Sequence, residues 1–393
     1  MISGEESEFE RWIERARLNQ LSDSDIAELA SRLAASGEQL SLQGKTADLA
    51  STGGPGSLST LWAPAALVAS GLLVPKLGVP GRPAGGIDAL CQVPGYRVDL
   101  NGIDARAVLE RCGYVHVIAG TTFAPADAAM FAYRQRTGAQ AIPELAIASL
   151  LSKKLAMGVK VVGLEVRVAR HGNFGANRED AKTNAQRFAR VAKLLGIEAV
   201  SFLTDGMTPQ QPYLGRGEAL LALSRLFAAK ACPWLEHHAL ACEGWTSALA
   251  RSAPPSRLGV AHAFACNILA QGGSVEGLEE RASNVAAAHS RIVPAIQHGV
   301  ISYDLSQLRA AILDARGPDT DGSFSDSAGL ILLAMPGTMV RKGQPLVSLR
   351  CADSALTKMY ESVLSAVRLN DQVEAIIPGS LLNTLEVVGV GDR

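Results

Sequence analysis

A glycine- and hydroxyl-rich stretch from Ala50 to Thr60, followed by an apolar run over 61–72, constrains this chain most. Glycines let backbone N–H groups approach an anion closely, hydroxyls add donors, and a helix start adds partial positive charge. The stretch lacks the Gly-Lys-Ser/Thr ending of a Walker loop and the spacing of a GxGxxG loop. It predicts a phosphate or pyrophosphate cradle that opens a helix, and a plain tight turn is the alternative. The candidate ligands are Ser51, Thr52, Gly53, Gly54, Ser59 and Thr60.

The composition excludes several classes of protein. The chain has 393 residues with 48% hydrophobic content, enough for a large core and more than one lobe. Its formal net charge of −1 argues against a nucleic-acid or membrane surface. The cysteines are scattered, the first residues are acidic and polar, and no apolar run approaches the ~20 residues of a membrane span. We therefore expect a cytoplasmic enzyme with a small-molecule partner, no nucleic acid and no membrane.

The order of the predicted elements indicates an α/β fold. Amphipathic patterns predict helices over 8–20 and 22–37, and strands alternate with helices from 114 to 203. This alternation favours a parallel or mixed sheet with helices on both faces. Residues 258–316 are expected to be mostly helical, and a small β-rich unit follows from Gly329. We expect that unit to be structural only.

Four features outside the loop are weighed as sites. The Gly/Pro-rich segment 72–97 carries Arg82, which either supplies a fixed positive charge to the anion site or is a solvated connector residue. His116, within an apolar strand, favours a core role over a catalytic one. The helix opened by Pro143 places Ser149 and Lys153 on one face. A zinc site is not expected at Cys232, His237, His238 and Cys242, whose spacing fits no common pattern.

Several motifs follow one another in a characteristic order along nearly the whole chain. They are Ser51–Gly56, Gly85–Leu90 with Pro94–Tyr96, the helix Ile147–Leu155, Leu203–Asp205, Leu214–Arg216 and the segment Gly337–Leu346. Together they resemble the motifs of the pyrimidine nucleoside phosphorylases, including thymidine phosphorylase, and more distantly those of the anthranilate phosphoribosyltransferases.

The resemblance implies a fold and a base-binding site. A small helical lobe would face a larger α/β lobe with a mixed sheet, across a cleft that holds base and phosphate. The implied segments are 1–44 and 125–157 for the helical lobe, 45–124 and 158–320 for the α/β lobe, and 321–393 for a C-terminal α+β unit. The family's base-binding residues correspond to Arg134, Ser149 and Lys153, and Arg134 and Lys153 are the catalytic candidates. Two cations and a hydroxyl suit a pyrimidine whose departure leaves negative charge.

The phosphate side departs from the family pattern. A phosphate-contacting lysine is replaced by Leu49, the adjacent histidine by Ala50, and a threonine by Ile87. Arg82 or Arg170 is the candidate replacement for the lost positive charge, and the loop around His171 is a candidate lid. The N-terminal region is also shorter than the family's by about a helix pair, so the family's homodimer is an open expectation here.

Three hypotheses follow. The first is a pentosyltransferase acting at a pyrimidine N-glycosidic bond, with phosphate or a sugar phosphate as co-substrate, or with water as nucleophile. The second is a catalytically inactive relative that binds a pyrimidine or nucleotide. The third is a phosphoribosyltransferase, which normally needs acidic residues for Mg²⁺ near the anion loop. No convincing acidic pair stands there, so no metal and no cofactor beyond the co-substrate is expected.

Overall fold

A mixed sheet forms the centre of the protein. The computed structural model describes residues 4–52, 56–81, 85–170, 172–317, 324–370 and 384–389. Strands β1 (Ala47–Ser51), β4 (Val161–Val168) and β5 (Glu198–Asp205) are parallel, and β13 (Thr384–Gly389) pairs with β5 in the antiparallel direction. The parallel pair β2 (Val74–Gly78) and β3 (Tyr114–Ile118) is joined to this sheet by a bridge between Thr46 and Leu73. The predicted α/β class with a mixed sheet is confirmed.

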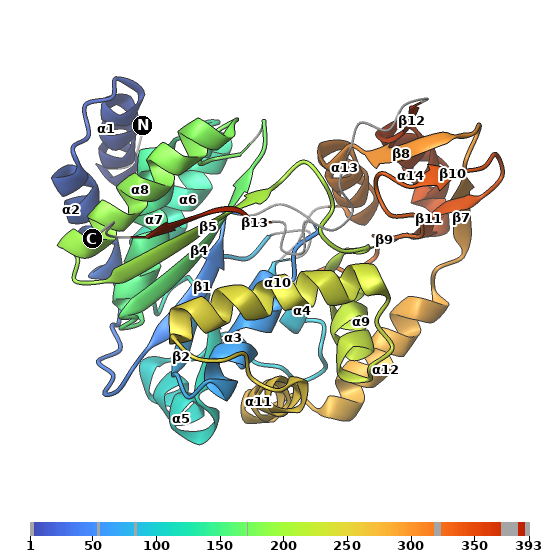
Figure 1. Ribbon diagram of the computed structural model, residues 1–393. Coiled ribbons are helices and arrows are strands. Elements are labelled where there is room, and N and C mark those ends of the chain that lie inside the picture. The colour runs from blue at the N-terminus through green and yellow to red at the C-terminus, as the bar shows by residue number, and fades with distance from the viewer. Residues whose placement is uncertain are drawn as a thin grey trace.

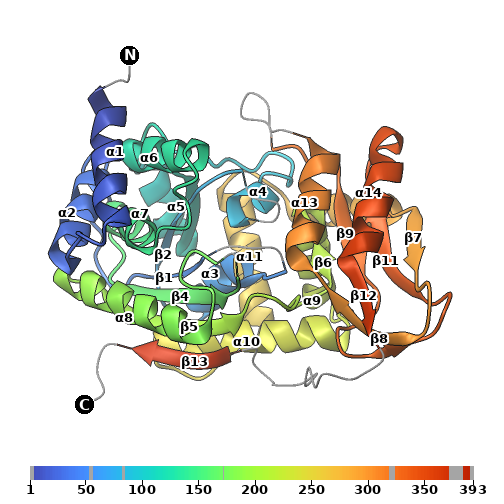
Figure 2. The ribbon, with the colours of Figure 1, turned by 90° about the horizontal axis from the view of Figure 1, so that it is seen from above.

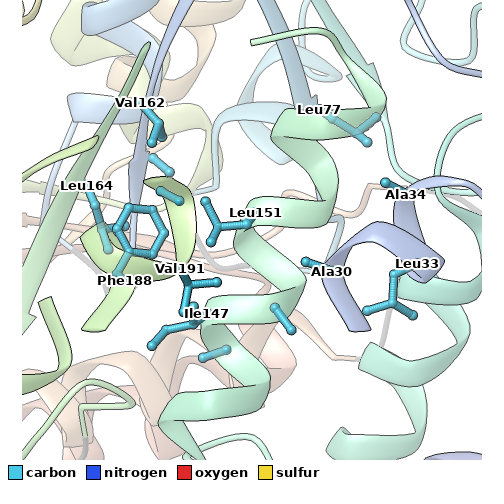
Figure 3. Packing of buried hydrophobic residues seen from close by; sticks show 14 of the residues in the cluster. Ala30, Leu33, Ala34, Leu77, Ile147, Leu151, Val162, Leu164, Phe188 and Val191 are labelled. Atoms are coloured by element: carbon cyan, nitrogen blue, oxygen red, sulfur yellow. The ribbon is translucent and has the colours of Figure 1, made fainter. Parts of the chain in front are cut away.

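Helices from two parts of the sequence form a lobe at one end of the molecule (Figure 1). These are α1 (Gly4–Arg17), α2 (Asp23–Ala34), α6 (Pro125–Arg136) and α7 (Pro143–Ala156), beside α8 (Arg178–Leu194). Ser22 caps the start of α2, as its sequence predicts, and Asp25 completes a capping box with it. Figure 3 shows Ile147 and Leu151 of α7 between α2 on one side and Phe188 of α8 on the other. This packing fixes α7, which carries Ser149 and Lys153, against the sheet.

Helices with a separate apolar core lie between the helical lobe and the C-terminal strands (Figure 2). They are α3 (Ser59–Ala69), α4 (Gly86–Leu90), α9 (Arg216–Phe227), α10 (Pro233–Ala250), α11 (Arg257–Ala270) and α12 (Val275–Ala287). The buried residues of α5 (Gly102–Cys112) belong instead to the core of the helical lobe. Helix α3 follows β1 directly, so the predicted hydroxyl loop does connect a strand to a helix. No helix in the described ranges is long and apolar enough to cross a membrane.

The C-terminal unit contains two small antiparallel sheets and two helices. One sheet has the order β6-β9-β11-β7 and the other β10-β8-β12. Its elements are β6 (Tyr213–Leu214), β7 (Arg291–Pro294), β8 (Gly299–Tyr303), α13 (Leu305–Arg316), β9 (Gly329–Leu332), β10 (Met339–Val340), β11 (Pro345–Arg350), α14 (Asp353–Ala366) and β12 (Val367–Asn370). The expectation that 258–316 is mostly helical missed β7 and β8. Both strands depend on partners far along the chain, which local pattern does not reveal.

The core of this unit includes residues from Val293 to Ala366, together with Leu214. Helix α13 and strands β7 and β8 therefore share a core with the strands after residue 328. The division of the chain into lobes stays a prediction, and we propose that the C-terminal unit begins near Arg291. Both ribbon views place α13 away from α6 and α7 (Figures 1 and 2), and Figure 2 shows α4 between them.

Candidate active site

One cavity of about 460 Å³ brings together most of the residues singled out from the sequence. This volume is in the range of about 300–1,000 Å³ that is usual for small-molecule sites. Its walls come from the end of β1, the start of α3, helices α6, α7 and α13, and the segments after β2 and β4. The predicted residues that line it are Ser51, Thr52, Ser59, Thr60, Arg134, Ser149 and Lys153. Gly53, Gly54 and Arg82 lie outside the described residues.

The α7 wall centres on a buried lysine. Lys153 Nζ donates to Asp127 Oδ2 at 2.6 Å and to Ser149 Oγ at 2.9 Å. Burial lowers the pKa of Lys153, and the neighbouring Lys154 and Arg134 add to this while Asp127 opposes it. The spacing of Ser149 and Lys153 predicted one helix face, and the two side chains do meet. The carboxylate of Asp127, from the first turn of α6, sets the position of the ammonium group.

Arg134 lines the same wall but is held largely by the backbone. Its guanidinium donates to the carbonyl oxygens of Ala139, Gln140 and Leu145 at 3.2, 2.9 and 3.1 Å. These bonds engage three of the five N–H donors of the side chain. Arg134 therefore fixes the connection between α6 and α7 as well as presenting a positive charge to the cavity.

A buried carboxylate that the sequence motifs did not predict holds the anion loop by hydrogen bonds. Glu165 of β4 is fully buried and accepts hydrogen bonds from Ser57 Oγ at 2.9 Å and Ser59 Oγ at 2.5 Å. The hydroxyl proton of Ser59 is thus directed at Glu165, so Ser59 orders the loop. The start of α3 has no side-chain cap and no acidic residue in its first turn. That arrangement favours an anion beside Thr60 and the β1 end.

Two lysines near the loop were missed as site residues. Asp48, on β1, is paired with Lys76 of β2 at 2.6 Å and with Lys154 of α7, and both lysines line the cavity. Burial would raise the pKa of Asp48, but the two lysines outweigh it and hold that pKa below its usual range. Burial lowers the pKa of Lys76. One carboxylate thus holds two ammonium groups. The sequence offered two signals: the Lys153-Lys154 pair, and the position of Lys76 in the segment 72–97, where Arg82 was the candidate cation.

His116 of β3 also faces the cavity, although the sequence favoured a core role. It is 1% exposed, and its Nδ1 lies 2.9 Å from the Tyr114 hydroxyl, which agrees with a histidine satisfied in the core. Burial, with Lys76 second, lowers the pKa of His116 well below its ordinary value, so the ring is neutral. A Cβ added at Gly78 or Gly86 would lie 2.9 or 2.7 Å from this ring, so both glycines make room for it.

The remaining walls add two arginines. Arg167 of β4 lines the cavity, and its Nε lies 3.9 Å from Glu165 Oε1. Arg309 and Ser306 line the cavity from α13. No described residue from 324 onwards is among those that line the cavity, so the expectation that the unit from Gly329 is structural only stays a prediction. Arg170 is exposed and is not among the described lining residues. His171 lies outside the described residues, and Gly172 and Asn173 beside it line the cavity.

His238 of α10 supports the loop from the far side. Its Nε2 accepts the Leu58 N–H at 2.7 Å, and burial lowers the pKa of His238 to about 4. Cys242 Sγ lies 3.8 Å from the same nitrogen. Within the described ranges, no group of three or more His, Cys, Asp and Glu residues is placed to hold a metal ion.

The neutral state of His238 predicts acid sensitivity. As the pH falls below the ordinary histidine pKa of 6.5, His238 becomes protonated in the unfolded chain. In the folded protein it stays neutral down to a pH of about 4. The free energy of unfolding therefore falls as the pH falls through this range. We expect His238→Gln, which keeps an acceptor for Leu58, to reduce the stability loss between pH 7.5 and 5 by about 2 kcal/mol. Urea unfolding at both pH values measures this. His298→Gln, at an exposed position, is the control, and an equal effect of both variants would contradict the assignment.

The comparisons with known proteins agree with the resemblance inferred from the motifs. No family model matches the chain. It is 29% identical over 335 residues to the thymidine phosphorylase of Burkholderia orbicola (strain MC0-3), covering 80% of this chain and 76% of that protein. It is 26% identical over 371 residues to the pyrimidine-nucleoside phosphorylase of Bacillus subtilis (strain 168), covering 87% and 84%.

Among solved structures, the anthranilate phosphoribosyltransferase of Thermus thermophilus aligns at 16% identity with a TM-score of 0.47, over 72% of this chain and 95% of that one. The sequence relationship to thymidine and pyrimidine-nucleoside phosphorylases is confirmed.

Proposed function

We propose that this homologue of the thymidine and pyrimidine-nucleoside phosphorylases is a pentosyltransferase that acts at the N-glycosidic bond of a pyrimidine nucleoside. One observation carries the proposal. A single cavity unites the α7 wall, with Ser149 and Lys153, and the hydroxyl-rich loop at the start of α3. A base and an anion can therefore bind in one cavity against different walls, as transfer of a pentosyl group between them requires.

The α7 wall is suited to the departing base. Bond cleavage leaves negative charge on the pyrimidine, and a fixed ammonium group stabilises that charge more in the transition state than in the ground state. Lys153 is held for this purpose by Asp127 and Ser149. Arg134 contributes positive charge and positions the α6–α7 connection.

The loop wall is suited to phosphate or a sugar phosphate. Ser51, Thr52 and Thr60 bring hydroxyls, and Lys76 and Lys154 supply the positive charge that the family's lysine would have supplied at position 49. Leu49 itself is buried in the apolar core with Leu58 and Trp62. In this proposal the anion site is rebuilt on β2 and α7. The cytoplasmic location and the homodimer stay predictions.

The test is base release by the purified protein from uridine, thymidine, deoxyuridine and cytidine, with and without inorganic phosphate, followed by chromatography. Phosphate-dependent release is the expected result. Release without phosphate would instead identify a nucleosidase that uses water. Binding of uracil without any release would identify a binding-only relative, and would overturn the proposal.

Lys76→Met tests the rebuilt anion site. The variant removes a cation from the loop wall and leaves Asp48 paired with Lys154. We expect the KM for phosphate to rise about 10- to 100-fold, as for loss of a charged hydrogen bond, with a smaller change in the KM for nucleoside. Lys193→Met, at an exposed position on α8, is the matched control. An unchanged KM for phosphate would place the anion elsewhere.

A further inference from the structure

The positive charges around the cavity fall into three groups. Among the described residues, six cationic side chains line it: Lys76, Arg134, Lys153, Lys154, Arg167 and Arg309. At the α7 wall, Lys153 is paired with Asp127, and Arg134 donates to backbone carbonyl oxygens. At the loop wall, Lys76 and Lys154 are paired with Asp48, and Arg167 lies near the carboxylates of Glu165 and Asp205. In both groups every cation therefore has a carboxylate or a carbonyl oxygen of the protein close to it.

The third group is Arg309 alone. No carboxylate or carbonyl of the described residues forms an ion pair or hydrogen bond with its guanidinium, although the side chain is half-buried. Removal from water lowers the pKa of Arg309, and no neighbouring charge offsets that effect. A half-buried guanidinium on a cavity wall is costly without an anion to bind. Arg309 is therefore the cation of the cavity for which the described residues supply no counter-charge.

The chemistry of this wall favours a phosphate monoester. A guanidinium presents a planar fork of N–H donors that matches phosphate oxygens. Ser306 lies three residues before Arg309 on the same helix and brings a hydroxyl to the same wall. Helix α13 lies away from α6 and α7 in both ribbon views (Figures 1 and 2), so this wall lies away from the base. A group bound there belongs to the far end of the pentose.

We propose that Arg309 and Ser306 bind a phosphate carried on the pentose, so that the preferred substrate is a pyrimidine nucleoside monophosphate and the product a doubly phosphorylated pentose. The inference rests on the proposed function. In the step, the N-glycosidic bond breaks with its electron pair going to the base, and an oxygen of inorganic phosphate forms the new bond to the anomeric carbon. The phosphate at the α13 wall is not transferred.

The experiment compares uridine with uridine 5′-monophosphate, each with inorganic phosphate, in the wild type and in Arg309→Gln. We expect the wild type to prefer the nucleotide. We expect Arg309→Gln to lower kcat/KM for the nucleotide about 10- to 100-fold, and by at least about tenfold more than for uridine. Arg309→Lys should recover part of the loss because it restores the charge without the fork. Arg341→Gln, at an exposed position of the same unit, is the matched control.

Equal losses on both substrates, or a wild type that prefers uridine, would overturn the inference and leave the proposed function standing. If neither substrate released base, the proposed function would fail, and calorimetric binding would then decide the inference alone. Weaker binding of uridine 5′-monophosphate to Arg309→Gln, with uridine binding less affected, would support it. A variant that loses affinity for inorganic phosphate but keeps affinity for the nucleotide would show that Arg309 binds free phosphate, and would contradict it.

Discussion

Asp48→Asn is expected to lower the free energy of unfolding by about 3–5 kcal/mol, because it leaves two buried ammonium groups without a carboxylate. Lys76 and Lys154 both pair with Asp48, and the three side chains are nearly inaccessible to water. An asparagine keeps the shape of the site but offers only one carbonyl oxygen. Urea unfolding followed by circular dichroism measures the change.

Two further variants separate uncompensated charge from local packing. Asp314→Asn breaks an ion pair with Lys358 whose side chains are 56% and 73% exposed, and is expected to cost less than about 1 kcal/mol. Adding Lys154→Met to Asp48→Asn removes one unpaired charge and should recover part of the lost stability. A double variant no more stable than Asp48→Asn alone would show that the loss does not come from the buried charges.

Lys153→Met is expected to lower kcat for base release by about 100- to 1,000-fold, the usual loss when a donor to developing negative charge is removed. Methionine has a similar length and no charge, so the α7 wall stays filled. The KM for nucleoside should change less than kcat, because the charge on the base develops mainly in the transition state. Steady-state kinetics with and without saturating phosphate measures both constants.

The same variant leaves Asp127 buried without its cation, so its fold has to be verified by the unfolding midpoint. Asp127→Asn with Lys153→Met removes both charges and serves as the matched control for stability. If the double variant folded as the wild type does and also kept the wild-type kcat, Lys153 would have no role in the chemistry.

The sequence predicted those strands and helix starts that residues close together in the chain determine. Short apolar runs predicted β3, β4 and β5, the residues Ser22 to Asp25 predicted the start of α2, and Pro143 predicted the start of α7. The spacing of Ser149 and Lys153 also predicted that the two side chains share a face. These features are settled by residues close together in the chain.

The rest of the site depends on pairings between distant segments. Lys76 and Lys154 are site candidates because both pair with Asp48, which lies 28 residues from Lys76 and 106 residues from Lys154 along the chain. Arg309 reaches the cavity only because α13 packs within the C-terminal unit. Strands β7 and β8 were missed because their partners follow much later in the chain. No periodicity or motif in one sequence encodes such pairings.

The Asp48 cluster also bears on how a substrate enters. It ties β1 of the sheet to α7 of the helical lobe by a buried ion pair, so a hinge between these two parts would have to expose three charges at once. Arg309, in contrast, reaches the cavity with no such tie among the described residues. The rest of the C-terminal unit is tied to α9 by the buried pair of Arg350 and Glu218, so a movement of α13 alone would leave both buried ion-pair groups intact.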